Sequence, residues 1–292
     1  MPNPLLEPVV AWYAASAREL PWRRPGTSAW AVLVSEVMLQ QTPVSRVLPV
    51  YDAWLERWPT PDDLAAEPAG EAVRAWGRLG YPRRALRLHA AAVAIAERHG
   101  GEVPDTHAEL RALPGVGDYT AAAVASFAHG GRHAVLDTNV RRVLARTLRG
   151  QEYPTRSVTR AERELAESLL PGEDDAHEPA LWAVAVMELG ALVCTASRPR
   201  CASCPVTDRC AWLAAGRPAY DGPPRPVQTY AGTDRQVRGL LLGVLRAHDG
   251  PVPAARLDAV WHDPAQRGRA LAGLVGDGLV VRRPGATYSL PD

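Results

Sequence analysis

The chain has 292 residues, with 33 basic side chains against 32 acidic ones and a formal net charge of +1. Apolar residues make up 47% of it, as in globular proteins, and no apolar run reaches the roughly 20 residues of a transmembrane helix. The N-terminus lacks the pattern of a secretory signal, so we expect a cytoplasmic protein. Every basic residue is arginine, which forms no Schiff base, so lysine imine chemistry is excluded.

Residues 5–215 have the composition and spacing of helices. Ala, Leu, Arg and Glu dominate, apolar residues recur three and four positions apart, and prolines mark turns or helix starts. No alternating strand pattern stands out before residue 226. Residues 132–149 and 194–226 are locally basic and could follow phosphates, although solvated helix faces would have the same composition. We therefore predict an all-α body.

The first motif in chain order is SEVMLQQT, residues 35–42, which places Glu36 among apolar neighbours on a predicted helix. Burying a carboxylate is costly unless it is paired or functional, and burial raises its pKa toward values useful to a general acid. A surface glutamate on an amphipathic helix is the alternative. The apolar neighbours favour the functional interpretation.

The second motif is LRALPGVGDYTAAAVASF, residues 110–127. It predicts a helix that ends at Leu113, a tight turn, and a second helix that starts near Asp118. Gly115 and Gly117 permit a positive φ and let a phosphate approach the backbone, where the amides of the new helix N-terminus would meet it. A plain glycine-rich turn is the alternative, but the length of the string favours phosphate binding.

The third motif is VLDTNVRRVLAR, residues 135–146, in which Asp137 precedes a basic helix. An aspartate at this place is a common helix N-cap. Capping and catalysis do not exclude each other, so Asp137 stays a candidate for both.

All four cysteines lie close together, with six, two and five residues between successive members: Cys194, Cys201, Cys204 and Cys210. A disulfide framework would scatter them, and in a cytosolic protein such a cluster indicates metal or cluster ligation. Zinc ribbons usually show two CxxC pairs, whereas this chain has one.

A segment rich in Pro and Gly, residues 217–232, is the clearest linker candidate. Beyond it we predict helices at 234–247 and 264–276, with a short helix near 253–260 between them. GLVVRRPGATYSL then predicts two strands around a Pro-Gly turn. Three short helices followed by a hairpin resemble a winged helix, a small α+β unit.

Together these strings, from LPWRR at 20–24 to Cys210, resemble the helix–hairpin–helix DNA glycosylase superfamily with an iron–sulfur loop, over about two-thirds of the chain. The resemblance implies a two-lobed fold with the substrate cleft between the lobes, and the cysteine spacing is that of the family's 4Fe–4S loop. The expected domains are a catalytic body (1–226), divided into a six-helix lobe with the hairpin (28–133) and an iron–sulfur lobe (1–27 and 134–226), and a C-terminal winged-helix-like domain (227–292).

Two branches of this superfamily differ at one position. Endonuclease III has a lysine two residues after the second hairpin glycine, where this chain has Tyr119. That difference, with SEVMLQQT and LPW, makes the sequence similar to the MutY branch of adenine DNA glycosylases. The implied reaction is hydrolysis of the N-glycosidic bond of adenine opposite 8-oxoguanine or guanine in double-stranded DNA, without strand cleavage. A mismatch thymine or uracil glycosylase and a non-catalytic DNA-binding protein are the alternatives.

The resemblance also assigns residue roles. Glu36 would protonate adenine at N7, Asp137 would stabilise the sugar cation, and Tyr119 and Asn139 would support them. The residues expected to contact the DNA are Trp22 and Arg23 around the flipped adenine, Gln41 and Tyr81 entering the duplex, Thr42 and Leu79 near the opposite base, and the hairpin glycines Gly115 and Gly117.

The chain also departs from the family pattern. Pro82 replaces a second tyrosine, and Val184 stands where many relatives have Gln or Glu. Typical relatives end in a MutT-like domain that reads 8-oxoguanine, whereas here only the winged-helix-like unit follows the linker. That unit either contacts DNA through Arg282 and Arg283 or is a structural or partner-binding appendage. We further expect a monomer that associates with the nucleoid and has no membrane partner.

Overall fold

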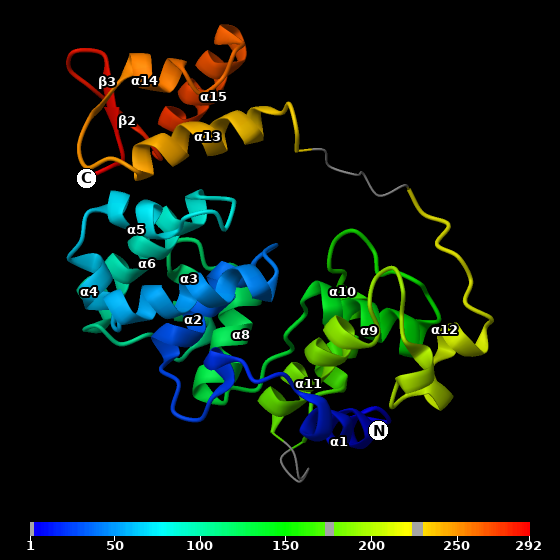
Figure 1. Ribbon diagram of the computed structural model, residues 1–292. Coiled ribbons are helices and arrows are strands. Elements are labelled where there is room, and N and C mark those ends of the chain that lie inside the picture. The colour runs from blue at the N-terminus through cyan, green and yellow to red at the C-terminus, as the bar shows by residue number, and fades with distance from the viewer. Residues whose placement is uncertain (1–2, 173–177, 224–229) are drawn as a thin grey trace. The chain divides into compact units, whose positions relative to one another are not determined.

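The computed structural model describes residues 3–172, 178–223 and 230–292 (Figure 1). These ranges are mainly helical, with three short strands near the C-terminus, which confirms the predicted fold class. By its internal contacts the chain divides into two units, one formed by Met1–Val32, Asp105–Arg111 and Gly117–Pro224, the other by Leu33–Pro104, Ala112–Val116 and Arg225–Asp292. The predicted domain boundary at residue 226 lies outside the described residues and stays a prediction.

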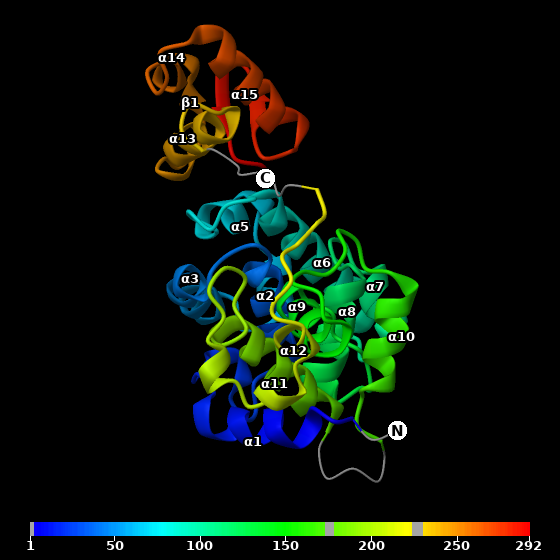
Figure 2. The ribbon, with the colours of Figure 1, turned by 90° about the vertical axis from the view of Figure 1, so that its right-hand side faces the viewer.

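The first unit is a helical bundle. Its helices are α1 (Leu6–Ser16), α8 (Asp118–His129), α9 (Thr138–Arg149), α10 (Arg160–Ser168), α11 (Pro179–Leu192) and the short α12 (Ala211–Ala214). Helix α1 lies alongside α11 (Figures 1 and 2), and α11 also packs on α9. Apolar side chains of these three helices, among them Val9, Val143 and Leu189, form the buried core. This core fixes α9 and the chain after α11, which carry Asp137 and the cysteines.

The second unit contains α2 (Ala29–Leu39, whose first four residues belong to the first unit), α3 (Val44–Arg57), α4 (Pro61–Ala65), α5 (Ala69–Ala75) and α6 (Arg83–His99). Three tryptophans form its centre: the rings of Trp54 and Trp58 meet edge to face at 4.7 Å, and those of Trp54 and Trp76 at 5.8 Å. Such pairs add to the stability gained by burial. Helix α7 (His107–Ala112) belongs to the first unit except for its last residue, and the hairpin turn and α8 follow it in the chain.

The C-terminal segment forms a small α+β element, as predicted. It comprises α13 (Asp234–Arg246), β1 (Val252–Pro253), α14 (Ala254–Asp258), α15 (Pro264–Gly276), β2 (Val281–Arg283) and β3 (Thr287–Ser289). The strands are antiparallel in the order β1-β3-β2, with Tyr288 opposite both Val252 and Arg282. The two-residue β1 was not predicted, because it is too short for an alternating pattern. The predicted linker at 217–232 lies partly outside the described residues.

This segment caps both ends of α5. The first-turn amides of Ala69 and Gly70 donate to the carbonyl oxygens of Asp292 and Pro291, at 3.2 and 2.9 Å. At the other end Arg246 donates to the carbonyls of Val73 and Gly77. Helix termini leave such groups without intrahelical partners, so the C-terminal segment supplies what α5 lacks. No helix in the described ranges is long and apolar enough to cross a membrane.

Candidate active site

Asp137 is the N-cap of α9. Its Oδ1 accepts a hydrogen bond from the Val140 amide at 2.6 Å, and its Oδ2 accepts one from Nδ2 of Asn139, also at 2.6 Å. Burial raises the pKa of the Asp137 carboxyl above its ordinary value, although these two donors act to lower it. The aspartate is therefore a helix cap and, at the same time, a fixed carboxylate removed from much of its solvent.

Asn139 is itself held from two sides. Its Oδ1 accepts a hydrogen bond from Nη2 of Arg142 at 2.8 Å, and Arg142 also donates to the carbonyls of Gly190 (2.6 Å) and Cys194 (2.7 Å). A Cβ at Gly190 would lie 2.7 Å from that of Asn139, so only glycine lets α11 approach α9 this closely. A continuous polar chain thus joins the Asp137 carboxylate to the backbone at the first cysteine.

Tyr119 and Gly117 belong to the same unit as Asp137. Gly117 is the exposed N-cap of α8, and Tyr119 is half-buried in the first turn of that helix, packed against an apolar cluster that includes Ala123 and Val135. The other hairpin glycine, Gly115, has φ +78°, and a Cβ there would lie 2.5 Å from that of Arg87. The predicted helix–turn–helix is confirmed, and Gly115 is the position at which the turn requires glycine.

Trp22 and Arg23 lie in a short 3-10 helix, Pro21–Arg23, fixed by an acid on α11. Glu188 is fully buried and accepts hydrogen bonds from Nε and Nη2 of Arg18 at 2.6 and 2.7 Å, and from Nη1 of Arg23 at 3.0 Å. Burial acts to raise the pKa of Glu188, but the two arginines outweigh it and hold the pKa below its ordinary value. Glu188 therefore fixes the backbone that carries Trp22, which is itself buried.

Glu36 lies in the second unit, on α2. It is 6% exposed among buried neighbours that include Val34 and Val37, which confirms the predicted burial. The surface-glutamate alternative is therefore wrong. Asp137 and Glu36 belong to different units.

Two adjacent loops of the second unit carry the other predicted DNA contacts. Gln41 is exposed with φ +55°, and Tyr81 is 44% exposed with φ +46°. Beside them Thr42 and Leu79 are buried, and the Thr42 hydroxyl donates to the Leu79 carbonyl at 3.2 Å. The structure thus brings these four residues together, with the two long side chains outward and the two smaller ones inward.

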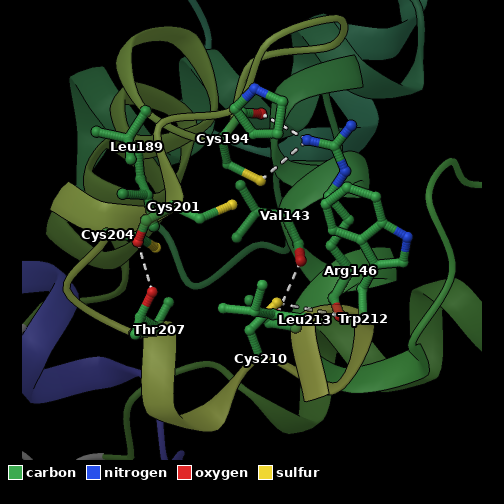
Figure 3. A pocket seen from close by; sticks show the side chains of 14 residues that line it. Val143, Arg146, Leu189, Cys194, Cys201, Cys204, Thr207, Cys210, Trp212 and Leu213 are labelled. Atoms are coloured by element: carbon green, nitrogen blue, oxygen red, sulfur yellow. Dashed lines mark hydrogen bonds between the residues drawn. The ribbon is translucent and has the colours of Figure 1, made fainter. Parts of the chain in front are cut away.

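The four cysteines, Cys194, Cys201, Cys204 and Cys210, line one cavity of the first unit (Figure 3). Val143, Leu189 and Trp212 supply its apolar wall. Burial raises the pKa of the Cys204 thiol to about 11, and it also raises the pKa of Cys194. Among the described residues, no group of three or more metal-binding side chains is close enough to hold a single metal ion.

The basic stretch at 132–149 is neither a phosphate-binding face nor a solvated one over its central part. Arg141, Arg142 and Arg146 are buried, with 8%, 8% and 1% exposed. Arg141 pairs with Glu162 at 3.0 Å, while the other two donate mainly to backbone carbonyls around the cysteine loop. Both interpretations of this stretch were wrong for these three residues, because charge counting does not show which way a helix faces.

The site contains two residues that the sequence analysis did not single out, Glu188 and Arg142. The signal for Glu188 was the one used for Glu36, a carboxylate within an apolar helix. In Glu188 that signal marks an ion pair rather than a candidate proton donor, so the pattern alone does not distinguish the two. Arg142 was counted as part of a basic face, and only its burial reveals its contacts.

Comparison with known proteins gives the site its context. Residues 34–168 match the family described as HhH-GPD superfamily base excision DNA repair protein. The chain is 53% identical over 285 residues to an adenine DNA glycosylase of Mycobacterium tuberculosis strain H37Rv, covering 97% of this chain and 92% of the relative. It is 42% identical over 211 residues to human adenine DNA glycosylase, covering 69% of this chain and 38% of that protein.

Solved structures agree with these matches. A thermostable thymine-DNA glycosylase is 27% identical with a TM-score of 0.64, covering 72% of this chain and 95% of that one. An endonuclease III trapped as a covalent intermediate with DNA is 25% identical with a TM-score of 0.60, covering 72% and 94%. The fold and the site thus define a helix–hairpin–helix DNA glycosylase, an enzyme of base excision repair that hydrolyses N-glycosyl bonds. Within that superfamily, the chain belongs to the adenine DNA glycosylase family.

Proposed function

We propose that this enzyme removes adenine mispaired with 8-oxoguanine or guanine from double-stranded DNA. The observation that carries the proposal is the Asp137 carboxylate, fixed by Val140 and Asn139 at the start of α9 with its pKa raised by burial. A desolvated, oriented carboxylate is suited to stabilise a cationic sugar. The 53% identity to an adenine DNA glycosylase over nearly the whole chain supports adenine as the base.

In the proposed reaction Glu36 donates a proton to N7 of adenine. The bond between C1′ and N9 then breaks, and adenine leaves with the bonding electron pair. Asp137 faces the resulting oxocarbenium-like sugar and can trap it as an ester, which water hydrolyses to an abasic site while Glu36 takes the water's proton. Tyr119 and Asn139 keep the carboxylate and sugar in place. The burial of Glu36 supports its role as the acid.

Recognition in this proposal is divided among short segments. Trp22 and Arg23 enclose the extruded adenine, and Gln41 and Tyr81 enter the base stack. Thr42 and Leu79 lie near the opposite base, and the amides beside Gly115 and Gly117 bind phosphate without reading sequence. The exposed, outward positions of Gln41 and Tyr81 support this assignment.

The strand stays intact in the proposed reaction. Strand cleavage by glycosylases of this fold uses a lysine imine, and this chain contains no lysine. Hydrolysis is then the only fate that the side chains support for the sugar, and the product is an abasic site.

We further propose that Cys194, Cys201, Cys204 and Cys210 hold a 4Fe–4S cluster. Four soft sulfur donors around one apolar-walled cavity fit such a group, and the chain has one CxxC pair, whereas zinc ribbons usually have two. When bound, the cluster would be ligated by the four thiolates and would hold the loop in shape. The test is analysis of the protein purified without oxygen for about four iron and four sulfide ions per chain.

The test of the proposed function is single-turnover cleavage of duplexes with A opposite 8-oxoguanine, A opposite guanine and T opposite guanine. We expect adenine release from the first two, with a strand break only after alkali. Release of thymine alone would instead support a mismatch thymine glycosylase, the activity named for the structural neighbour at 27% identity. Binding without release would support the non-catalytic alternative. We also expect the protein to be a monomer, which sedimentation of the free protein tests. We expect it to act in the cytoplasm on the DNA of the nucleoid.

A further inference from the structure

Arg84, in the first turn of α6, is buried with 6% of its surface exposed. Its guanidinium donates to five oxygens in the second unit. They are the carbonyls of Val37 (2.8 Å), Met38 (3.0 Å), Gln40 (2.6 Å) and Gly80 (3.1 Å), and the hydroxyl of Thr42 (2.9 Å). Four of these residues lie in the last turn of α2 or just after it, and the fifth, Gly80, lies in the loop before α6, so one side chain joins both loops.

No acid in the described part of the chain balances this charge. Within the described residues Arg84 forms no ion pair, and its buried Nε has no hydrogen-bond partner. Burial lowers its pKa to about 10, which still leaves it protonated at neutral pH. Burying an unpaired cation is costly, and what offsets the cost here is the negative end of the α2 dipole and the rings of Trp76 and Tyr81, 5.1 and 5.6 Å from Cζ.

The two loops that Arg84 joins contain strained backbone. Gln41 and Tyr81 have positive φ, a conformation that is unfavourable for residues other than glycine. Both residues are adjacent to a direct acceptor: Gln41 lies between Gln40 and Thr42, and Tyr81 follows Gly80. The bonds of Arg84 therefore fall on each side of one strained residue and immediately before the other.

We propose that Arg84 is a positioning residue that holds the Gln41 and Tyr81 side chains outward, ready to enter the duplex beside a mispair. The inference rests on the proposed function, because it takes these two residues as the duplex-entering pair. An unbalanced buried cation is a poor way to gain stability alone. We explain its placement by the backbone that it holds: its hydrogen bonds keep Gln41 and Tyr81, whose side chains are exposed, in their positive-φ conformation.

The experiment compares Arg84→Met and Arg84→Lys with the wild type, and uses Arg98→Met, an exposed arginine at the far end of α6, as the matched control. Dissociation constants are measured for a duplex with A opposite 8-oxoguanine, with 2′-fluoroadenosine to prevent cleavage, and for the same duplex fully paired. A 2-aminopurine next to the 8-oxoguanine reports unstacking. The rate at saturating enzyme is measured on the cleavable duplex, and melting temperature and circular dichroism check folding.

For Arg84→Met we expect the affinity for fully paired DNA to stay within about threefold of the wild type. The ratio of the dissociation constants for paired and mispaired DNA should fall at least tenfold, and the 2-aminopurine signal should be lost. Arg84→Lys keeps the charge but not the planar guanidinium, so its preference for the mispair should lie between those of the wild type and Arg84→Met. A purely structural role predicts instead a lower melting temperature, equal losses on both duplexes and an unchanged saturating rate per folded enzyme. That result, or an unchanged preference in both folded variants, overturns the inference.

The same experiment separates this inference from the proposed function. If the wild type unstacks 2-aminopurine but releases no adenine, the proposed function fails while the role of Arg84 is still tested by the fluorescence of its variants. If the wild type releases adenine and the Arg84 variants unstack normally, only the inference fails.

Discussion

Arg146 in the first unit and Arg84 in the second both hold irregular backbone by hydrogen bonds, in different surroundings. Both are buried arginines on long helices that hold irregular backbone. Arg146 donates to the carbonyls of Glu152, Thr195 and Ala196, and to Sγ of Cys194 at 3.4 Å, with its Cζ 4.7 Å from the Trp212 ring. In each region one guanidinium uses its fixed set of donors to hold loop carbonyls beside a tryptophan.

The difference lies in what surrounds the charge. Arg146 lines the same cavity as the four cysteines, which would carry negative charge as the ligands of a cluster. Among the described residues, the contacts of Arg84 are to neutral oxygens and aromatic rings. Arg146 therefore has a prospective counter-charge, and Arg84 relies on a helix dipole. We propose that the first holds a cofactor loop and the second a recognition surface, and the predictions below test that division.

The largest effect is expected for Arg146→Met. The substitution takes the guanidinium donor away from three loop carbonyls, and hydrogen bonds from a charged group contribute about 1.5–3 kcal/mol each. We expect the free energy of unfolding to fall by about 3 kcal/mol or more, together with most of the bound iron, as measured by urea denaturation and iron analysis. Arg160→Met, which changes an arginine whose side chain is 91% exposed, is the control. Full iron content in Arg146→Met would contradict the role of Arg146 in holding the cysteine loop. Iron loss in Arg84→Met would contradict the separation of the two roles.

A pH-dependent loss of stability is expected for Arg18, which pairs with the buried acid Glu188. Arg84 has no such acid partner among the described residues. Arg18 and Arg23 hold the pKa of Glu188 below its ordinary value against the effect of burial, so this pair stabilises the fold above the unfolded pKa of about 4.3 and loses that contribution as pH falls through the lower folded pKa. In Glu188→Gln we expect a stability deficit of about 2 kcal/mol at pH 7 that shrinks below about pH 4. Denaturation at several pH values measures it, with exposed Glu164→Gln as control; a deficit independent of pH contradicts the ion-pair account.

A smaller effect is expected at Arg246, a half-buried arginine for which the described residues provide no acid partner. It donates to the carbonyls of Val73 and Gly77 at the end of α5, and burial lowers its pKa to about 10. Arg246→Met should lower the free energy of unfolding by about 1–2 kcal/mol and leave adenine release at saturating enzyme unchanged. Exposed Arg235→Met is the control. A large change in the ratio of the rates on A·8-oxoguanine and A·G would instead implicate the C-terminal segment in reading the lesion.

The sequence predicted the regular parts of this molecule well. Composition and periodicity predicted a helical body and located the C-terminal helices, the glycines located the hairpin turn, and the Pro-Gly turn located the C-terminal strands. The burial of Glu36 followed from its apolar neighbours. These features depend on residues close together in the chain, which is why a local pattern is enough.

What the sequence could not give were the partners of buried charges. Some of the carbonyls that accept hydrogen bonds from the arginines lie more than 40 positions away in the chain, as seen for Arg84, Arg146 and Arg246. A backbone carbonyl has no sequence signature. Glu188 shared its pattern with Glu36, and only its contacts with Arg18 and Arg23 set it apart. The positive φ of Gln41 and Tyr81 was equally invisible, because neither residue type favours that conformation.

The measurement that tests the account most directly is the single-turnover rate of adenine release opposite 8-oxoguanine for wild type, Glu36→Gln and Asp137→Asn. Glu56→Gln and Asp105→Asn, at exposed positions, serve as controls. We predict that the first two variants lose a factor of about 10²–10⁴ while still binding the duplex, because each lacks a group that acts in the transition state. The controls should match the wild type. Wild-type rates in Glu36→Gln or Asp137→Asn, with both proteins folded, would contradict the proposed chemistry.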